Sequence, residues 1–261
     1  MVYLLFFGIC FGASVIGAIC GIGGGVIIKP LMDALGFMDV PTISFLSGCT
    51  VLCMTAYSVA ESKLSGRSNI ETKTSLPLGI GGAIGGIAGK ALFQYLVSIS
   101  ADKNSIGAVQ AICLFIVTAG TLVYTLNKSK IRTYQITNIG ACLSIGVLLG
   151  MMSSFLGIGG GPINLVILFF FFSMTTKIAA ENSLYIILFS QLASLLQSLI
   201  TNSVPEFEIG ALIFMAAGGV CGGIAGRIFN KKIGENDVNR LFIALMVVII
   251  LINIYNAYKF I

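Results

Sequence analysis

The sequence predicts an all-α integral membrane protein built from two homologous repeats, and three observations lead to this fold class. The 261 residues are 57% hydrophobic and only 10% charged, with a mean hydropathy of +1.01. Long stretches carry no charged side chain, and two glycine-rich motifs each occur twice. A soluble domain is about 25% charged, and a disordered chain needs low hydrophobicity and high charge. Both of those classes are therefore excluded.

Eight hydrophobic segments follow one another along the chain, each long enough to enter a bilayer. The first begins at the N-terminus, with no basic region before it and no clear cleavage site after it, so we expect it to be retained. The runs are continuous rather than alternating, which excludes a transmembrane β-barrel. The predicted segments are 2–36, 41–60, 75–98, 105–126, 135–173, 179–202, 208–229 and 238–258.

Two motifs recur at nearly the same spacing. The sequence GIGGG occupies 21–25 and again 157–161, and GGAIGGIAGK at 81–90 returns as GGVCGGIAGR at 218–227. Two separate repeats with one offset indicate a duplicated unit of about 130 residues. We therefore divide a single transmembrane domain into repeat one (1–127), a basic joint (128–132) and repeat two (133–261).

Basic residues favour one of two arrangements of these repeats, because Lys and Arg collect on the cytoplasmic side of a membrane. If all eight segments cross and the repeats are parallel, the two sides receive nearly equal shares. If each repeat instead has one full span followed by a re-entrant hairpin, formed by the stretch after GIGGG and the next segment, the repeats are inverted. Ten basic residues then lie on one side and five on the other, the five being Lys29, Lys90, Lys103, Lys177 and Lys259. We favour the inverted arrangement.

The GIGGG motif predicts a break in a membrane helix. Val26 or Pro162 follows it, so the Gly-Lys-Ser/Thr ending of a phosphate-binding loop is missing. Three glycines in a row cost roughly 3 kcal/mol of helix propensity, although close helix packing through small residues is an alternative interpretation. A broken backbone at membrane depth lines a cavity or is buried in protein, and the N–H groups at the start of a half-helix attract anions. The candidate anion-binding glycines are Gly23, Gly24, Gly25, Gly159, Gly160 and Gly161.

The GGIAGK and GGIAGR motifs predict close helix packing, since small residues three or four positions apart let two helices approach. Lys90 and Arg227 end these motifs, and we expect them to extend toward the lipid headgroups.

Polar residues gather at the second break and at the turn that follows it. Lys177 and Glu181 are four residues apart, and they form either an interfacial ion pair or a functional pair buried in the membrane. In the second case Lys177 would help to hold an anion and Glu181 would carry a proton. Neutral hydrogen-bonding groups come from Asn164, Asn182, Ser183 and from Ser47, which corresponds to Ser183 in repeat one.

Metal and cofactor sites are not expected. The chain contains no histidine, and its seven cysteines lie inside apolar segments without a C-x-x-C motif. Cys49 and Cys53 share a helix face, but two thiols make an incomplete zinc site. The basic residues stand in short clusters between apolar runs, which is typical of membrane loops rather than of nucleic-acid binding.

The twin GIGGG breaks, the polar turn at Asn182 and Ser183, and the GGIAGK/GGIAGR pair resemble the TauE/SafE family of sulfite and organosulfonate exporters. The resemblance covers nearly the whole chain and implies secondary transport of small sulfur-containing or carboxylate anions across the cytoplasmic membrane. Pro30 matches the proline that the family carries after its first break, whereas Val166 stands at the corresponding place in repeat two. The family's small-Thr-Ser pattern at the turn is Glu181-Asn182-Ser183 here and Leu46-Ser47-Gly48 in repeat one. These departures concern the choice of substrate more than the class.

These observations predict a multi-pass transporter of the plasma or inner membrane, most simply an exporter of sulfite or an organosulfonate that works by alternating access. A passive anion channel and a non-transporting membrane partner are the alternatives. Enzymatic activity is not expected, since hydrolytic chemistry would have few candidate groups. We expect a small anion and the lipid bilayer as partners, no nucleic acid, and leave a homodimer open.

Overall fold

The computed structural model describes residues 2–65, 70, 72–100 and 103–260, and within this part of the chain it is entirely helical. The first half contains α1 (Val2–Cys20), α2 (Gly25–Leu35), α3 (Val40–Leu64), α4 (Thr72–Ile99) and α5 (Lys103–Asn127). A 3-10 turn, η1 (Lys128–Lys130), begins the joint. The second half contains α6 (Ile139–Leu156), α7 (Pro162–Phe172), α8 (Thr176–Ile200), α9 (Ile209–Lys232) and α10 (Glu235–Phe260).

The predicted segments agree closely with these elements. Segments 2–36 and 135–173 correspond to the pairs α1–α2 and α6–α7, and the other six correspond to single long helices. Both halves follow the same order of lengths, with 19, 11, 25, 28 and 25 residues in the first and 18, 11, 25, 24 and 26 in the second. This order is what a duplicated unit would produce.

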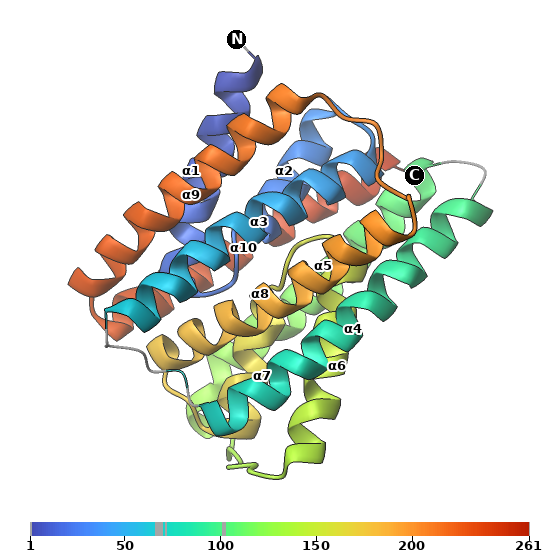
Figure 1. Ribbon diagram of the computed structural model, residues 1–261. Helices are drawn as coiled ribbons and strands as arrows, with labels where there is room; N and C mark the ends of the chain where they lie inside the picture. Colours follow the sequence, from blue (N-terminus) through green and yellow to red (C-terminus); the bar gives the residue numbers. More distant parts are fainter. Residues whose placement is uncertain (1, 66–69, 71, 101–102, 261) are drawn as a thin grey trace.

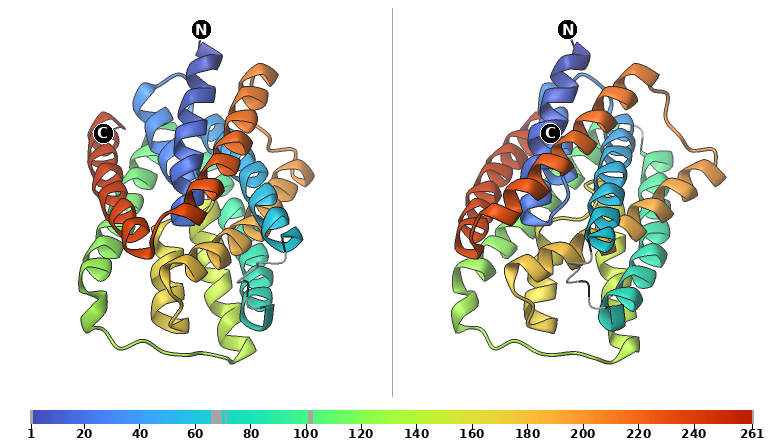
Figure 2. Two further views of the ribbon diagram at one scale, coloured as in Figure 1. Left: turned by 90° about the vertical axis from the view of Figure 1, so that its left-hand side faces the viewer. Right: turned by 60° about the vertical axis from the view of Figure 1, so that its left-hand side comes forward.

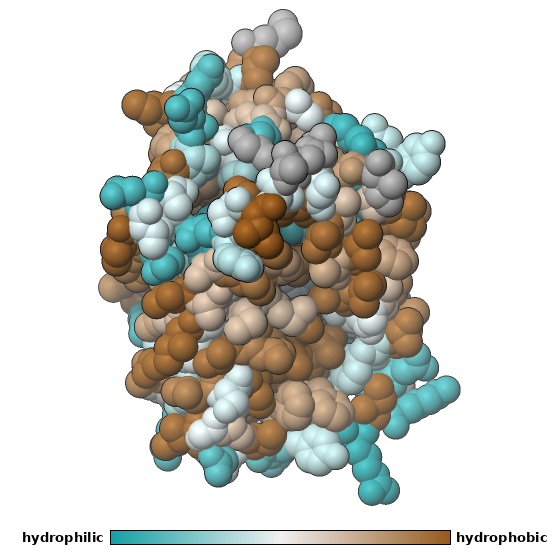
Figure 3. Space-filling view, turned by 90° about the vertical axis from the view of Figure 1, so that its right-hand side faces the viewer, coloured by the Kyte–Doolittle hydropathy of each residue, from teal (hydrophilic) through white to brown (hydrophobic). Residues whose placement is uncertain are grey.

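Eight of these helices are long and apolar enough to cross a membrane, α7 being a shorter apolar helix of 11 residues. Apolar side chains cover the middle of the face drawn in Figure 3, and hydrophilic ones lie toward its two ends. This distribution suits a bilayer-embedded protein, because the hydrocarbon region excludes unpaired polar groups.

The two ends of the molecule can be assigned from side-chain contacts. At one end Tyr3 Oη donates to Glu208 Oε2 at 2.5 Å, and Lys259 Nζ donates to the carbonyl of Asp33 at 3.0 Å. At the other end Lys128 Nζ donates to Asn239 Oδ1 at 2.7 Å. We call these the terminal end and the joint end, because both chain termini lie at the first and the joint crosses the second (Figure 2).

The chain reverses inside each GIGGG motif, so that α1–α2 and α6–α7 are helical hairpins. The rings of Phe6 and Phe37 pack with centroids 5.8 Å apart, which places the end of α2 beside the beginning of α1. In the second half Ser173 Oγ, just after α7, donates to Thr133 Oγ1 at 2.7 Å. The expected hairpin, made of the stretch after GIGGG and the next segment, is therefore wrong. The positive φ angles of the motif glycines turn the chain within the motif itself, and α3 and α8 continue unbroken for 25 residues each.

The hairpins place both motifs near the centre of the molecule, and the remaining long helices run from end to end around them (Figures 1 and 2). Each half then consists of a hairpin and three long helices, an odd number, so the second half runs in the opposite sense to the first.

The helices form two bundles, and each bundle takes helices from both halves. We group α1, α2, α3, α9 and α10 as the first bundle and α4, α5, α6, α7 and α8 as the second, although α5 and α10 pack more extensively on each other than on the rest of their own bundles. Their main mutual contacts are α3 with α8 and α5 with α10. Figure 1 shows the first bundle above the second, with α3 and α8 along their boundary.

The GGIAG motifs hold each bundle together, as their spacing predicts. A Cβ on Gly85 would lie 2.0 Å from the carbonyl oxygen of Val147 on α6, and one on Gly222 would lie 2.3 Å from that of Phe11 on α1. Only a residue without a side chain lets these backbones approach so closely. α4 therefore packs along α6, and α9 packs along α1 in the same way.

Candidate anion-binding centre

The two GIGGG turns meet each other at the centre of the protein. A Cβ on Gly25 would lie 2.1 Å from the carbonyl oxygen of Ile158, and one on Gly23 would lie 3.1 Å from that of Gly159. Gly21, Gly23, Gly157 and Gly159 have φ between 65° and 74°, the left-handed region that glycine alone adopts freely. The predicted helix breaks are thus confirmed, and each break is in contact with the other.

The turns lie beside the midpoints of α3 and α8. A Cβ on Gly159 would lie 2.6 Å from Val51 Cγ1, and one on Gly160 would lie 2.4 Å from Ile187 Cδ1. Val51 and Ile187 are fully buried and hold equivalent places in the two repeats, near the middle of their 25-residue helices. Together with the glycine turns they form a packed barrier halfway between the two ends.

Both half-helices begin at this barrier without a side-chain cap. Gly24 precedes α2 and Gly161 precedes α7, and in the described part of the chain no side chain accepts a hydrogen bond from either helix start. Pro162 occupies the first position of α7, which suits the fixed backbone angle of proline. The backbone N–H groups at the start of a helix carry a partial positive charge, so two such charges point toward the centre.

Three of the predicted neutral groups lie near the barrier. Ser47 and Ser183, one helical turn before Val51 and Ile187, are 0% exposed, and Asn164 is 1% exposed. Within the described residues the hydroxyls of both serines and Asn164 Oδ1 have no hydrogen-bond partner. A buried polar atom without a partner costs free energy, so these atoms are candidate ligands for a polar substrate.

The other predicted residues lie elsewhere. Asn182 Nδ2 donates to the carbonyl of Ile178 at 2.8 Å, and its Oδ1 accepts from Ser75 on α4, so this side chain faces α4. Lys177 Nζ donates to the carbonyls of Asn230 and Ile233 at 3.0 and 2.7 Å. Lys177 therefore binds the C-terminal end of α9 at the joint end, not the opposite side to which the predicted topology assigned it.

Lys29 faces neither the lipid headgroups nor a cavity, because it pairs with a carboxylate of its own helix. Its Nζ lies 2.6 Å from Asp33 Oδ2, and the two side chains are 3% and 6% exposed. A close buried pair of this kind neutralises its own charge. Lys29 is accordingly a structural residue of α2.

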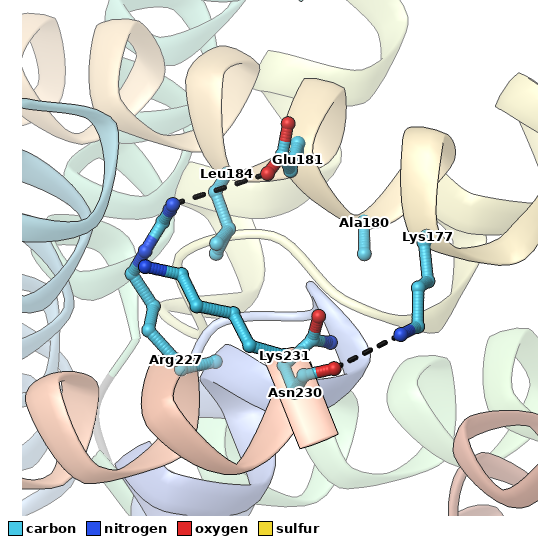
Figure 4. Close-up of a pocket in the computed structure, with 8 residues that line it drawn as sticks. Lys177, Ala180, Glu181, Leu184, Arg227, Asn230 and Lys231 are labelled. Atoms are coloured by element: carbon cyan, nitrogen blue, oxygen red, sulfur yellow. Dashed lines mark hydrogen bonds and ion pairs between the residues drawn. The ribbon is translucent and has the colours of Figure 1, made fainter. Parts of the chain in front are cut away.

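A cavity lies on the joint side of the barrier, between the two bundles. We call it the joint-side cavity, and Figure 4 shows its lining. Arg227 Nη2 lies 3.9 Å from Glu181 Oε1 across the bundle boundary, and Arg227 Nη1 donates to the carbonyl of Ser58 at 2.6 Å. Glu61 also pairs with Arg227 Nε and lies 2.9 Å from Lys231 Nζ. The lining residues are Ala18, Lys177, Ala180, Glu181, Leu184, Arg227, Asn230 and Lys231.

A second cavity lies on the terminal side, again between the bundles, and we call it the terminal-side cavity. Its lining is polar but carries no carboxylate: Ser44, Phe45, Gly48, Cys49, Lys90, Ser154, Gly157, Gln191, Ser194, Leu195 and Ser198. The two cavities are equivalent under the internal repeat. Shifts of 136 or 137 residues relate Ala18 to Ser154, Ser44 to Ala180, Gly48 to Leu184, and Lys90 to Arg227.

Lys90 and Arg227 are the residues that sequence reasoning misplaced. Instead of extending to the headgroups, Lys90 is 7% exposed and the Arg227 side chain 12% exposed, each beside a cavity. The helical stripe explains this position. Gly82 and Gly86 face Ile186 and Ser190 on α8, and Lys90 continues the same stripe one turn later. Counting four residues on from each packing glycine would have given the direction.

The residues described by the structure contain no cluster of His, Cys, Asp or Glu that could hold a metal ion. The cysteines among them are free, and Cys49 alone lines one of the two cavities.

The sequence matches the family described as Sulfite exporter TauE/SafE over residues 6–252. The chain belongs to the TauE/SafE family. This is a membrane transporter family rather than an enzyme family, and its match together with eight candidate spans makes the chain a multi-pass membrane protein.

Two curated relatives match this TauE/SafE protein over almost its full length. It is 23% identical to the Probable membrane transporter protein YunE of Bacillus subtilis (strain 168), over 95% of this chain and 94% of the relative. It is 24% identical to a Probable membrane transporter protein of Haemophilus influenzae, over 93% of this chain and 94% of that relative. No solved structure matches the chain significantly.

Proposed function

We propose that this TauE/SafE protein is a secondary transporter for a small anion, sulfite or an organosulfonate, and that it works by alternating access. One observation carries the proposal. Two cavities equivalent under the internal repeat lie on opposite sides of a packed central barrier, and both are on the boundary between the same two bundles. A static scaffold has no need of such a pair, whereas a carrier opens one cavity and then the other.

Rocking of one bundle against the other would exchange the open side. The boundary consists mainly of the contacts of α3 with α8 and of α5 with α10. In the structure Lys177 and Glu181 of the second bundle contact α9 of the first. These contacts would hold the joint side closed. Opening that side would break them while the barrier residues Val51 and Ile187 slide past the glycine turns.

The centre itself offers what an anion requires. The uncapped starts of α2 and α7 would donate backbone N–H groups, and Ser47, Ser183 and Asn164 would supply side-chain contacts. These groups are neutral, which favours an anion that must be released again over one that is held tightly. Lys177 would contribute charge only after its contacts with α9 have opened.

The distribution of basic residues orients the protein. With Lys177 moved to the joint end, the basic residues at this end of the described structure are Lys63, Lys73, Lys128, Lys130, Arg132, Lys177, Arg227, Lys231, Lys232 and Arg240. The terminal end keeps Lys29, Lys90, Lys103 and Lys259. Cytoplasmic loops are the richer in Lys and Arg, so we place the joint end in the cytoplasm of a plasma or inner membrane, with the two repeats inverted.

Counterflow in proteoliposomes tests this function. Vesicles loaded with unlabelled sulfite are placed in a trace of labelled sulfite, with sulfate, sulfoacetate and acetate as competitors. A carrier accumulates label transiently, and the competitors rank its anions. Sulfite leakage through the protein without accumulation would favour a passive channel. No movement of any anion would contradict the proposed function and favour a non-transporting partner.

Proton coupling through Glu181 is a separate proposal. Its carboxylate faces Arg227 at the mouth of the joint-side cavity, where a change of protonation would alter the contact between the bundles. A Glu181→Gln protein should lose uptake driven by a pH gradient but keep counterflow. Full gradient-driven uptake by this variant would remove the proposal.

A further inference from the structure

The terminal-side cavity contains a buried positive charge that no carboxylate compensates. Lys90 is 7% exposed, and its Nζ lies 5.3 Å from the centroid of the Phe93 ring. Among the described residues its ammonium group forms no ion pair and no hydrogen bond. An ionised side chain inside a membrane protein is costly and usually has a function. Lys90 is therefore the feature of this cavity that most needs a partner.

Arg227, which corresponds to Lys90 in the joint-side cavity, has carboxylates beside it. Arg227 contacts Glu61 and faces Glu181, so its charge is balanced by protein. The first-half counterpart of Glu181 is Phe45, and the second-half counterpart of Glu61 is Gln197. The same backbone arrangement therefore surrounds Lys90 with neutral groups where it surrounds Arg227 with carboxylates.

Those neutral groups are hydrogen-bonding side chains. Ser44 is 5% exposed, and its hydroxyl has no partner in the described part of the chain. Ser154 is 4% exposed and has only a long contact, 3.4 Å, with the hydroxyl of Ser190. Gln191 Nε2 donates weakly to Ser153 Oγ at 3.3 Å. A cation, two hydroxyls and an amide around one small cavity match the oxygen atoms of an oxyanion.

We infer that Lys90, with Ser44, Ser154 and Gln191, is the anion-binding site of the terminal-side cavity, and that it takes a singly charged oxyanion such as hydrogen sulfite or an organosulfonate. One ammonium balances one negative charge, so a dianion such as sulfate would leave half of its charge buried without a partner. Arg227 is the equivalent group on the joint side, where Glu61 occupies it while that side is closed. This inference rests on the proposed transport function for its physiological meaning, but the site can be tested without transport.

The transport test compares Lys90→Gln with Lys90→Arg and with Lys232→Gln, a matched loss of one exposed positive charge at the end of α9. In counterflow, Lys90→Gln should raise the half-saturation concentration of the anion about tenfold or more, the order expected from removing one nearby charge at low dielectric. Lys90→Arg should stay within about threefold of the parent, and Lys232→Gln should not change it. An unchanged half-saturation concentration in Lys90→Gln would overturn the inference.

A second readout keeps the site testable if the protein moves no anion. Cys49 lines the same cavity, so a protein retaining only this cysteine can be labelled with an anionic and with a cationic methanethiosulfonate reagent. Lys90 should favour the anionic reagent, and Lys90→Gln should lower the ratio of the two rates about tenfold. An unchanged ratio would show that Lys90 does not set the potential of the cavity.

Ser44→Ala tests the same site if size-exclusion chromatography shows that the Lys90 variants do not fold. This substitution removes only an unpartnered hydroxyl and should raise the half-saturation concentration several-fold with Lys90 in place. Methanesulfonate bound at the site should protect Cys49 from labelling. If Ser44→Ala changes neither transport nor this protection, the assigned site is contradicted. Absence of transport with an intact labelling ratio would reject the transport function alone.

Discussion

Gly25→Ala tests the contact between the two glycine turns, on which the description of the centre depends. A Cβ at this position would lie 2.1 Å from the carbonyl oxygen of Ile158 and 2.9 Å from Val51 Cγ2. Both neighbours belong to the packed barrier, and the closer of them is backbone. The new methyl group could be accommodated only if the first turn moved away from the second.

The expected cost follows from this overlap. Overpacking a tight core typically costs 1–3 kcal/mol, and alanine recovers less than about 1 kcal/mol of helix propensity relative to glycine. We therefore expect a net loss of about 1–2 kcal/mol. For a chain of this size this corresponds to a fall of roughly 2–8 °C in Tm. Anion counterflow should fall more steeply, because the turns would no longer present their N–H groups at the same place.

Gly12→Ala is the matched control. It lies on α1 of the same hairpin, and a Cβ there would meet no atom within 4 Å. Its Tm should stay the same or rise, and its counterflow should be normal. Melting in detergent and counterflow in vesicles are measured on both variants and on the parent protein. If Gly25→Ala has the same Tm as Gly12→Ala and transports normally, the two turns do not contact each other as described.

Three further changes probe the barrier, the joint-side contacts and the central hydroxyls. Ile187→Ala should cost about 2–5 kcal/mol of stability and let labelled anion leak without saturation. If this variant does not leak, Ile187 does not seal the centre. Glu61→Gln leaves Arg227 without its strongest partner. Because this pair is partly exposed, the free energy of unfolding should change by less than about 1 kcal/mol, while labelling of a cysteine introduced at Ala18 should speed up. Unchanged labelling would argue against closure of the joint side by this pair. Ser183→Ala removes a hydroxyl without a partner, so Tm should hold while the half-saturation concentration rises about fivefold, and an unaltered value would exclude this hydroxyl from the site.

Much of the fold could be predicted because its determinants are local. Continuous apolar runs give helices long enough to span, and glycines with positive φ end them. The recurring motifs were visible because GIGGG and GGIAG each need glycine for a backbone reason, one for a turn and the other for close approach. Residues constrained in this way stay recognisable in both halves even where the rest of the sequence differs.

The place of the reversal could not be predicted in the same way. Hydropathy does not distinguish a hairpin closed inside GIGGG from one closed after it, since α2 is apolar in both cases. The decision depends on contacts between distant parts of the chain, such as that of Phe6 with Phe37. Lys177 was assigned to the wrong side for this reason, and Asn182 was grouped with Ser183 although adjacent helical residues point in different directions.

The direction of the Lys90 side chain depends on a contact between two helices. The residues around Lys90 and around its counterpart Arg227 explain why the two cavities differ. The two halves have the same order of helices, and both GGIAG motifs place a cation beside a bundle boundary. The carboxylates at Glu61 and Glu181 are not repeated, and only the joint-side cation is therefore held by protein. In a transporter with equivalent halves the two closed states would otherwise have similar free energies. Under the proposed alternating-access mechanism, unequal compensation of the two cations would give the protein a preferred resting side, and an anion that binds at Lys90 would shift the balance by its differential affinity for the two states.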